Sequence, residues 1–361
     1  MWDAYVHAHP QATLYHLYGW RNVIERTYGH KTYYLAATRD TRLSASSIQY
    51  PDLVGILPLV HLKHFLFGNS LISMPFFDLG GILADGEDAE RMLLVHALKL
   101  GQQLKADTIE LRHAESMKGL TAINNPPSSR NSTDATEDFH FVTRSHKVRM
   151  SLDLLASSDL LMGHFRPRLR TKIRKSLKEN LTPRIGGSEL LNDFYEVFST
   201  NMRDLGSPVH SIRLMQHVLK AFLDKARIIV IHKDHRAMAC SLVIGFRDTL
   251  ESPWVSSIRK FSRLSPNIFL YWTMMEYARD RGYTSFEFGR SSPGEGPYQF
   301  KKQWGPKPLP LHWHYIYLSG KTIVDPTFEK PTFKKAIHCW QKLPLPVTKI
   351  IGPMVRKHIG L

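Results

Sequence analysis

The architecture of this chain is most readable in residues 251–305, ESPWVSSIRKFSRLSPNIFLYWTMMEYARDRGYTSFEFGRSSPGEGPYQFKKQWG. A short apolar, β-favouring run surrounds Trp254. Ser265-Pro266 then gives the usual signal for a helix start, with serine as the N-cap and proline in the first turn. Apolar residues recur at helical spacing up to Gly282, which predicts a helix with one buried face: Ile268, Tyr271, Trp272, Met275 and Ala278.

The second half of the stretch contains the candidate chemistry. Phe286 and Phe288 alternate with Glu287, which places the carboxylate on the opposite face of a strand from the two rings. Residues 289–297, GRSSPGEGP, form a loop that is too rich in glycine and proline for regular structure. It is also too charged to be buried without a purpose. An aromatic and basic segment, residues 298–305, follows the loop directly.

Several motifs carry a resemblance to a known family. FGRS (288–291), the Gly/Pro loop and YQFKKQWG (298–305), preceded by SPNIFLYW (265–272), resemble the signature of the FemAB-like acyltransferases. The resemblance is closest to the FemAB-related proteins associated with bacterial exosortase/PEP-CTERM export and exopolysaccharide systems. It implies two tandem GNAT-like domains. For the best-known members it also implies transfer of an aminoacyl group from tRNA to a peptidoglycan precursor.

The resemblance extends over nearly the whole chain. It includes the segment 2–20, VGILPLVHLKHFLFG (54–68), LISMPFFDLGG (71–81) and R-x-K-I-R-K (170–175). RDLGSP (203–208) also resembles a family motif at the substrate cleft, which implies that Asp204 and Ser207 contact substrate.

The 361 residues suit two domains followed by a tail. We expect a first α/β unit over 1–113, a polar linker or inserted loop over 114–146, and a second unit over 147–320. Helices and strands alternate in both units, which predicts α/β architecture with mixed sheets. With the resemblance, this becomes two tandem GNAT-like acyltransferase domains followed by a basic amphipathic tail, 321–361.

The compartment is expected to be the cytoplasm. No apolar run approaches about 18 residues, so no transmembrane helix is expected. The first residues, MWDAYVHAHPQ, lack the pattern of a secretory signal. The two cysteines, Cys240 and Cys339, do not form a disulfide scaffold.

Positive charge is concentrated in two segments of a chain whose net charge is +16. Residues 163–181 hold seven Lys/Arg against one Glu, and residues 321–361 hold eight against two acids. In the first segment Leu169, Ile173 and Leu177 fall on one face, so a helix with a thin apolar seam and a broad cationic surface is predicted. The cations repel one another, so we expect an anionic donor to bind there through Arg168, Lys172, Arg174 and Lys175. A solvated charged face is the alternative.

Acyl transfer to an amine needs a base, a stabiliser for the oxyanion and a place for the donor's phosphates. Glu287 is the candidate base, because its apolar neighbours would raise its pKa. An ion pair with Arg290 or a lysine is the alternative role. Tyr298 is a candidate proton donor, and Lys301 and Lys302 are candidates for neutralising a phosphate or oxyanion, with plain surface charge as the alternative. Arg290 and Ser291 are candidates for substrate binding in the loop.

The donor is left open between aminoacyl-tRNA and acyl-CoA, and no tightly bound cofactor is expected. Residues 259–266, RKFSRLSP, stand where a coenzyme A cradle needs glycines, yet they contain none, and Pro266 lacks an N–H. This favours a donor held by side-chain cations. No metal is expected, since His61/His64 and His312/His314 fit no zinc spacing, and the chain has no Walker A loop, G-x-S-x-G or G-x-G-x-x-G motif.

The tail alternates apolar residues with lysine and arginine, a composition typical of interfacial helices on anionic membranes. Packing back on the protein is the alternative. The resemblance implies an acyl- or aminoacyltransferase for a cell-envelope or exopolysaccharide precursor, and the tail adds an expected peripheral contact at the inner membrane. The competing hypotheses are acetylation from acetyl-CoA, a non-catalytic membrane-docked scaffold with a degenerate acyltransferase fold, and general nucleic-acid binding through Arg166–Lys178.

Overall fold

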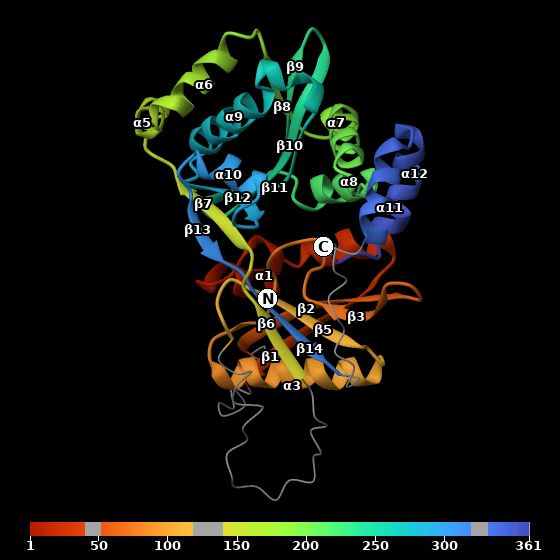
Figure 1. The fold of residues 1–361 in the computed structure, drawn as a ribbon. Helices are drawn as coiled ribbons and strands as arrows, with labels where there is room; N and C mark the ends of the chain where they lie inside the picture. The colour runs from red at the N-terminus through yellow and green to blue at the C-terminus, as the bar shows by residue number, and fades with distance from the viewer. Residues whose placement is uncertain (40–51, 118–139, 319–330, 361) are drawn as a thin grey trace, which may run out of the picture.

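The computed structural model describes residues 1–39, 52–117, 140–318 and 331–360, and Figure 1 shows two mixed sheets covered by helices. Most of the predicted linker, residues 118–139, and the first part of the predicted tail, residues 321–330, lie outside the described residues.

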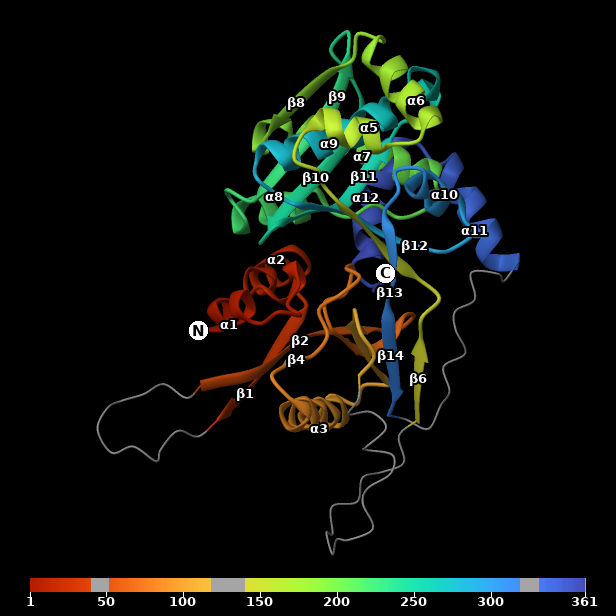
Figure 2. The ribbon, with the colours of Figure 1, turned by 90° about the vertical axis from the view of Figure 1, so that its left-hand side faces the viewer.

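The first sheet has the strand order β1-β2-β3-β5-β14-β6, with β4 paired to β2. Helix α3 (Glu87–Gln103) covers one face, and α1 (Trp2–Ala8), η1 (Leu14–His16) and α2 (Gly19–Tyr28) lie between this sheet and the second unit (Figures 1 and 2). The strands are β1 (Lys31–Arg39), β2 (Asp52–His64), β3 (Gly68–Ile72), β4 (Leu83–Ala84), β5 (Thr108–His113), β6 (His140–Arg144) and β14 (His312–Tyr317).

The second sheet has the order β13-β7-β12-β11-β10-β9-β8. One face packs on α7 (Leu191–Asp204), preceded by η2 (Ser188–Leu190), and on α8 (Ile212–Ala221). The other packs on α9 (Pro266–Asp280), which α6 (Pro167–Leu177) covers in turn. The strands are β7 (Val148–Asp153), β8 (Thr182–Gly186), β9 (Ala226–Lys233), β10 (Arg236–Phe246), β11 (Thr249–Ser257), β12 (Ser285–Ser291) and β13 (Lys307–Pro310). The remaining helices of this unit are α5 (Ser158–His164), η3 (Arg259–Leu264) and α10 (Gly296–Lys302).

A two-stranded ribbon joins the sheets. Strand β6 pairs with β14 in the first sheet and β7 pairs with β13 in the second, and a hydrogen bond from Leu311 N to Lys147 O (2.9 Å) continues the ladder between them. Figure 2 shows β13 of the second unit directly above β14 of the first, with β6 beside β14. Residues 140–144 and 312–317, predicted as linker and second unit, therefore complete the first sheet. A long-range strand exchange of this kind leaves no local pattern in the sequence.

Three local expectations differ from the structure. Ser265 occupies the N-cap position of α9 with φ +56° and makes no capping hydrogen bond with its side chain. Helix α9 is buried nearly all round rather than on one face, because it lies between the sheet and α6. In α6, Leu169 and Ile173 are buried, but Leu177 is 49% exposed, so the apolar seam ends one turn early.

The tail packs on the protein, as the alternative interpretation held. Helices α11 (Pro331–Lys342) and α12 (Leu345–Arg356) lie against α7. Gly352 is buried, and a Cβ there would lie 3.0 Å from Val209. Past α12, the Gly360 carbonyl accepts hydrogen bonds from Phe76 N (2.8 Å) and Arg112 Nη2 (2.9 Å) of the first unit. The tail thus ties the two units together, while Ile350, Ile351 and Met354 stay exposed.

Candidate functional site

One candidate site is a pocket of about 570 Å³ between the two units. It opens where two parallel strands part: β11 and β12 pair only from Thr249↔Ser285 to Glu251↔Glu287, and the later residues of both strands line the pocket. The first unit contributes Phe76, Phe77 and Asp78 to the opposite wall. Pockets between domains, at points where sheet strands separate, are common ligand sites.

A glycine shapes the β12 wall. Gly289 has φ +71°, and the pairing of β12 with β7 shifts register between Glu287 and Arg290. This irregularity turns Arg290 toward the first unit. There its backbone N–H donates to Asp78 Oδ2 (3.3 Å), and its guanidinium Nη1 lies 3.0 Å from Asp78 Oδ1. Asp78, on the opposite wall of the pocket, therefore holds Arg290 of the FGRS motif in place.

Two carboxylates stand side by side in the pocket, because Glu251 and Glu287 are register partners on adjacent strands. Burial, and next the charge of Glu287, raises the pKa of Glu251 to about 8. Burial also raises the pKa of Glu287, against the opposing effect of Arg149. Two neighbouring carboxyl groups in such a setting hold a proton near neutral pH, which suits general acid–base chemistry.

Glu287 has fixed partners of its own. Its Oε1 accepts a hydrogen bond from Met150 N (3.0 Å), and its Oε2 lies 3.6 Å from Arg149 Nη1. It is 5% exposed. The ion pair considered for Glu287 thus exists, but with Arg149 in place of Arg290 or a lysine.

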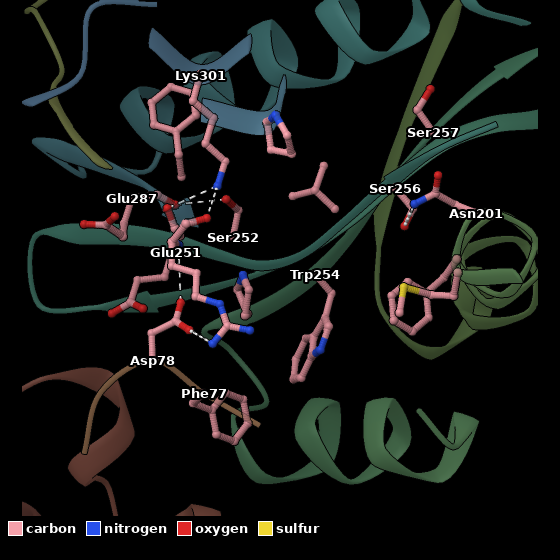
Figure 3. Close-up of a pocket in the computed structure, with 18 of the residues that line it drawn as sticks. Phe77, Asp78, Asn201, Glu251, Ser252, Trp254, Ser256, Ser257, Glu287 and Lys301 are labelled. Carbon is pink, nitrogen blue, oxygen red and sulfur yellow. Dashed lines mark hydrogen bonds and ion pairs between the residues drawn. The ribbon is translucent and has the colours of Figure 1, made fainter. Parts of the chain in front are cut away.

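Lys301 is the lysine of the pair that enters the pocket. Its Nζ donates to the carbonyls of Gly289 (3.1 Å) and Arg290 (2.8 Å), which brings it against the β12 bulge. Burial lowers its pKa to about 8, while Asp78 and Glu287 act in the opposite direction. Figure 3 shows Lys301, Glu251, Glu287 and Asp78 toward one end of the pocket and Asn201, Ser256 and Ser257 toward the other.

Other predicted residues lie outside the pocket. Lys302 is exposed on α10, and Tyr298 packs against the core beside α9. Ser291 is buried and its hydroxyl donates to the Arg290 carbonyl (2.9 Å). The structure therefore brings together Glu287, Arg290 and Lys301 from the predicted set.

The basic helix α6 lies on the outer surface. Arg168, Arg174 and Lys175 are exposed, and Lys172 Nζ donates to Gln303 Oε1 (2.8 Å) just after α10. This contact places the cationic surface beside the helix whose Lys301 lines the pocket. The arrangement can hold the phosphates of a large donor outside the pocket while its reactive end enters.

The RDLGSP loop lies against the tail. Asp204 pairs with its neighbour Arg203 (2.6 Å), and its carbonyl accepts from Gln341 Nε2 (3.0 Å) of α11. A Cβ on Gly206 would lie 2.4 Å from Ile337 Cγ2 of the same helix. Asp204 and Ser207 do not line the pocket, whereas Asn201, Met202 and His210 on either side do.

Sequence reasoning missed the other charged residues that line the pocket, Asp78, Glu251 and Arg356. The first two had a signal in the sequence: Asp78 interrupts an apolar run, and Glu251 is a charged residue at the start of a β-favouring run. Arg356 had none, since it looks like any other cation of the tail.

A second pocket, of about 560 Å³, lies on the first unit beside the start of α3 and is lined by His16, His113, Glu115 and Arg149 among others. Arg149 lines this pocket and pairs with Glu287 of the first, so the two cavities adjoin at this ion pair. Within the described ranges no group of three or more His, Cys, Asp or Glu side chains is placed to hold a metal ion. No helix of those ranges has both the length and the apolar composition to cross a membrane.

Comparisons with known proteins address the fold. Residues 163–302 match the family model described as the acetyltransferase (GNAT) domain, a range that includes α6, both glutamates and Lys301. No curated protein matches the chain. The structure is similar to that of FemX, with a TM-score of 0.64 and 17% identity over 86% of this chain and 94% of FemX.

Two further solved structures are similar. One is the C-terminal domain of a putative lysylphosphatidylglycerol synthetase from Agrobacterium fabrum (TM-score 0.52, 11% identity, 81% of this chain and 85% of that one). The other is a conserved protein of unknown function from Bacteroides thetaiotaomicron (TM-score 0.52, 9% identity, 82% and 88%). At such identities the likeness is one of fold, and it confirms the predicted mixed α/β, GNAT-like architecture.

Proposed function

We propose that the pocket between the units transfers an acyl or aminoacyl group to an amine of a cell-envelope precursor. The observation that carries the proposal is the Glu251–Glu287 pair beside Lys301, at the diverging strands of a GNAT-like sheet. The likeness of fold to FemX and to a lysylphosphatidylglycerol synthetase domain supports the substrate class.

The reaction follows from the groups present. The carboxylate pair takes a proton from the acceptor ammonium, and the freed nitrogen attacks the carbonyl carbon of the donor ester or thioester. A C–N bond forms, and the bond from the carbonyl carbon to the leaving oxygen or sulfur breaks. Lys301 stabilises the oxyanion while it exists. As the adduct collapses, its nitrogen gives a second proton to the carboxylate pair, which has released the first proton to water, and the pair passes this second proton to the leaving group.

Aminoacyl-tRNA is the donor that we favour over acyl-CoA. The cations of α6 lie outside the pocket but beside α10, where a polyanion too large for the pocket can bind. Residues 259–266 form η3 and the start of α9 without glycine, so the backbone cradle that coenzyme A phosphates use is not provided by the sequence.

The deciding experiment compares binding of charged tRNA, uncharged tRNA and acetyl-CoA to the purified protein at two salt concentrations. A preference for charged over uncharged tRNA is expected. Saturable acetyl-CoA binding would point instead to acetylation of a sugar or polysaccharide. Salt-sensitive tRNA binding that ignores the aminoacyl group would reduce the role of α6 to general nucleic-acid binding.

A non-catalytic scaffold is the competing function. A complementation assay with Glu287→Gln and Lys301→Met separates the transferase from the scaffold. Lys302→Ala, at the exposed neighbouring lysine, is the control. Full complementation by the first two variants would favour the scaffold. The exosortase-associated resemblance directs the choice of strain toward exopolysaccharide export.

The tail adds a second part to the proposal, contact with an anionic membrane surface. Residues 331–361 contain six Lys/Arg and no Asp or Glu. Ile350, Met354 and His358 follow one another at four-residue spacing, and the His358 ring stacks 6.2 Å from Phe67. At this β2–β3 hairpin Phe65 is 88% and Leu66 71% exposed. Apolar tips beside cations complement a lipid surface with negative headgroups.

Co-sedimentation with vesicles tests this contact. Binding to phosphatidylglycerol vesicles above phosphatidylcholine vesicles is expected, with loss in a Phe65→Ser/Leu66→Ser variant. Leu160→Ser is the control, because Leu160 is 58% exposed on α5, on the opposite side of the molecule from α12 (Figure 1). Equal binding by all three proteins would contradict a role for the hairpin.

A further inference from the structure

Arg356 enters the pocket from the last turn of α12. Two buried residues, Thr348 and Gly352, position this helix, and Gly352 packs closely against Val209. The backbone beyond it is held by the hydrogen bond between His30 Nε2 and Lys357 O (2.8 Å). The position of Arg356 in the pocket is therefore set by packing, because the chain is held in place both before and after this residue.

The guanidinium of Arg356 has a neutral partner. Arg356 Nε donates to His210 Nε2 (3.0 Å), so the proton of His210 is on Nδ1, which contacts Tyr28 Oη at 2.7 Å. Burial, and next Arg356 itself, holds the pKa of His210 well below its usual value, so this histidine stays uncharged. Within the described residues no hydrogen bond or ion pair occupies the two terminal nitrogens of Arg356.

The other arginines near the pocket have carboxylate partners. Arg290 pairs with Asp78 (3.0 Å), Arg149 with Glu287 (3.6 Å) and Arg112 with Glu110 (2.8 Å). Arg356 pairs with no described carboxylate, and burial lowers its pKa to about 10, with Arg290 and Arg112 acting in the same direction. It remains charged at neutral pH in a place where a charge without a counterion is unfavourable.

We propose that Arg356 is an anion-binding residue that holds a phosphate or carboxylate group of the molecule bound in the pocket. With Nε occupied by His210, the terminal nitrogens form the planar fork that suits both anions. The assignment of this anion to a substrate rests on the proposed function, whereas the anion site itself does not. A substrate would thus be held by its anionic group at Arg356 while its amine lies at the carboxylate pair.

Thermal denaturation at constant ionic strength tests the site, with inorganic phosphate and acetate as the probes. At least one anion is expected to raise the Tm of the wild-type protein. In Arg356→Met the apparent affinity for the anion is expected to fall at least tenfold. In Arg356→Lys it should fall by less, because lysine keeps the positive charge and loses only the planar fork of the guanidinium. Response to phosphate alone indicates a phosphate-bearing substrate, and response to acetate indicates a carboxylate.

Two controls keep the test decisive. Arg213→Met removes an exposed cation of α8 and should leave the response unchanged. A quadruple glutamine variant of α6, at Arg168, Lys172, Arg174 and Lys175, should also retain it. Without anion, Arg356→Met should have a Tm equal to or above that of the wild type, because an unpaired charge is removed.

The inference is overturned if no anion stabilises the wild-type protein, or if Arg356→Met responds as the wild type does. If Arg356→Met does not fold, Arg356→Lys decides by the same comparison of affinities. Glu287→Gln separates this inference from the transfer reaction, since it should abolish transfer and keep the anion response. If Arg356→Met lost transfer activity but kept the stabilisation by anions, the anion site would be contradicted, whereas the proposed transfer reaction would not.

Discussion

The outer cations of α6 and the inner arginine of the pocket differ in what surrounds them. Arg168, Arg174 and Lys175 stand in water, where high dielectric and salt screen their mutual repulsion. Arg356 is half-buried, and a neutral histidine is its partner. The first kind of charge costs little and is tolerated in clusters, whereas the second persists only if something compensates it.

The two kinds of charge therefore suggest different tasks. A screened surface attracts a polyanion at long range without selecting its details. A half-buried, oriented group selects one chemical group at one place. The same contrast separates Lys302 from Lys301, neighbours in sequence of which one is exposed and the other contacts the β12 bulge.

The largest effect is expected from Glu287→Gln, with Glu295→Gln as the exposed control. Loss of a general base lowers rates by about 10²–10⁴-fold. The amide of glutamine keeps an acceptor for the Met150 N–H, so the strand should stay in place. Steady-state kinetics should show the loss in kcat for Glu287→Gln and a rate close to wild type for Glu295→Gln. Equal rates for both would remove Glu287 from the reaction.

The inner and outer faces of α6 can be compared by stability. Ile173→Ala removes a fully buried side chain and should lower the free energy of unfolding by about 2–5 kcal/mol. Leu177→Ala removes a side chain that is 49% exposed and should change it by less than about 0.5 kcal/mol. Urea unfolding followed by circular dichroism measures both. Similar losses of unfolding free energy in the two variants would show that Leu177 is buried with Leu169 and Ile173, as the sequence suggests.

The half-buried carboxyl of Glu251 should make stability depend on pH. Its pKa is raised from 4.5 to about 8 in the folded protein, so between these values the folded state binds more protons than the unfolded state. Its contribution is complete below the unfolded pKa and is lost as pH rises through the folded one, at up to about 1.4 kcal/mol per pH unit.

Unfolding of the wild type and Glu251→Gln at pH 5, 6.5 and 8 measures this contribution. Relative to the glutamine variant, the wild type should lose on the order of a few kcal/mol from pH 5 to pH 8. A constant difference between the two proteins would show that Glu251 titrates normally.

The sequence predicts elements better than it predicts the site. The strand–helix–strand order of 251–305 and the side of β12 that bears Glu287 follow from periodicity and from glycine and proline, because these effects are local. The strand ribbon and the pairing of Asp78 with Arg290 arise from contacts between residues far apart in the chain. Arg356 belongs to the tail, and its place in the pocket depends on how the whole tail packs.

The smallest effect is expected from the outer cations, and it tests the contrast directly. Replacing Arg168, Lys172, Arg174 and Lys175 by glutamine should weaken tRNA binding by about tenfold or more at low salt. It should also reduce the slope of log K against log salt by about 0.7–0.9 for each phosphate that the protein no longer neutralises. Arg356→Met should leave that slope within one such unit, because one half-buried arginine releases few counterions. Filter binding at several salt concentrations measures both. If Arg356→Met flattened the slope as much as the α6 variant does, the polyanion would reach into the pocket, and the division between an outer surface that attracts and an inner residue that selects would fail.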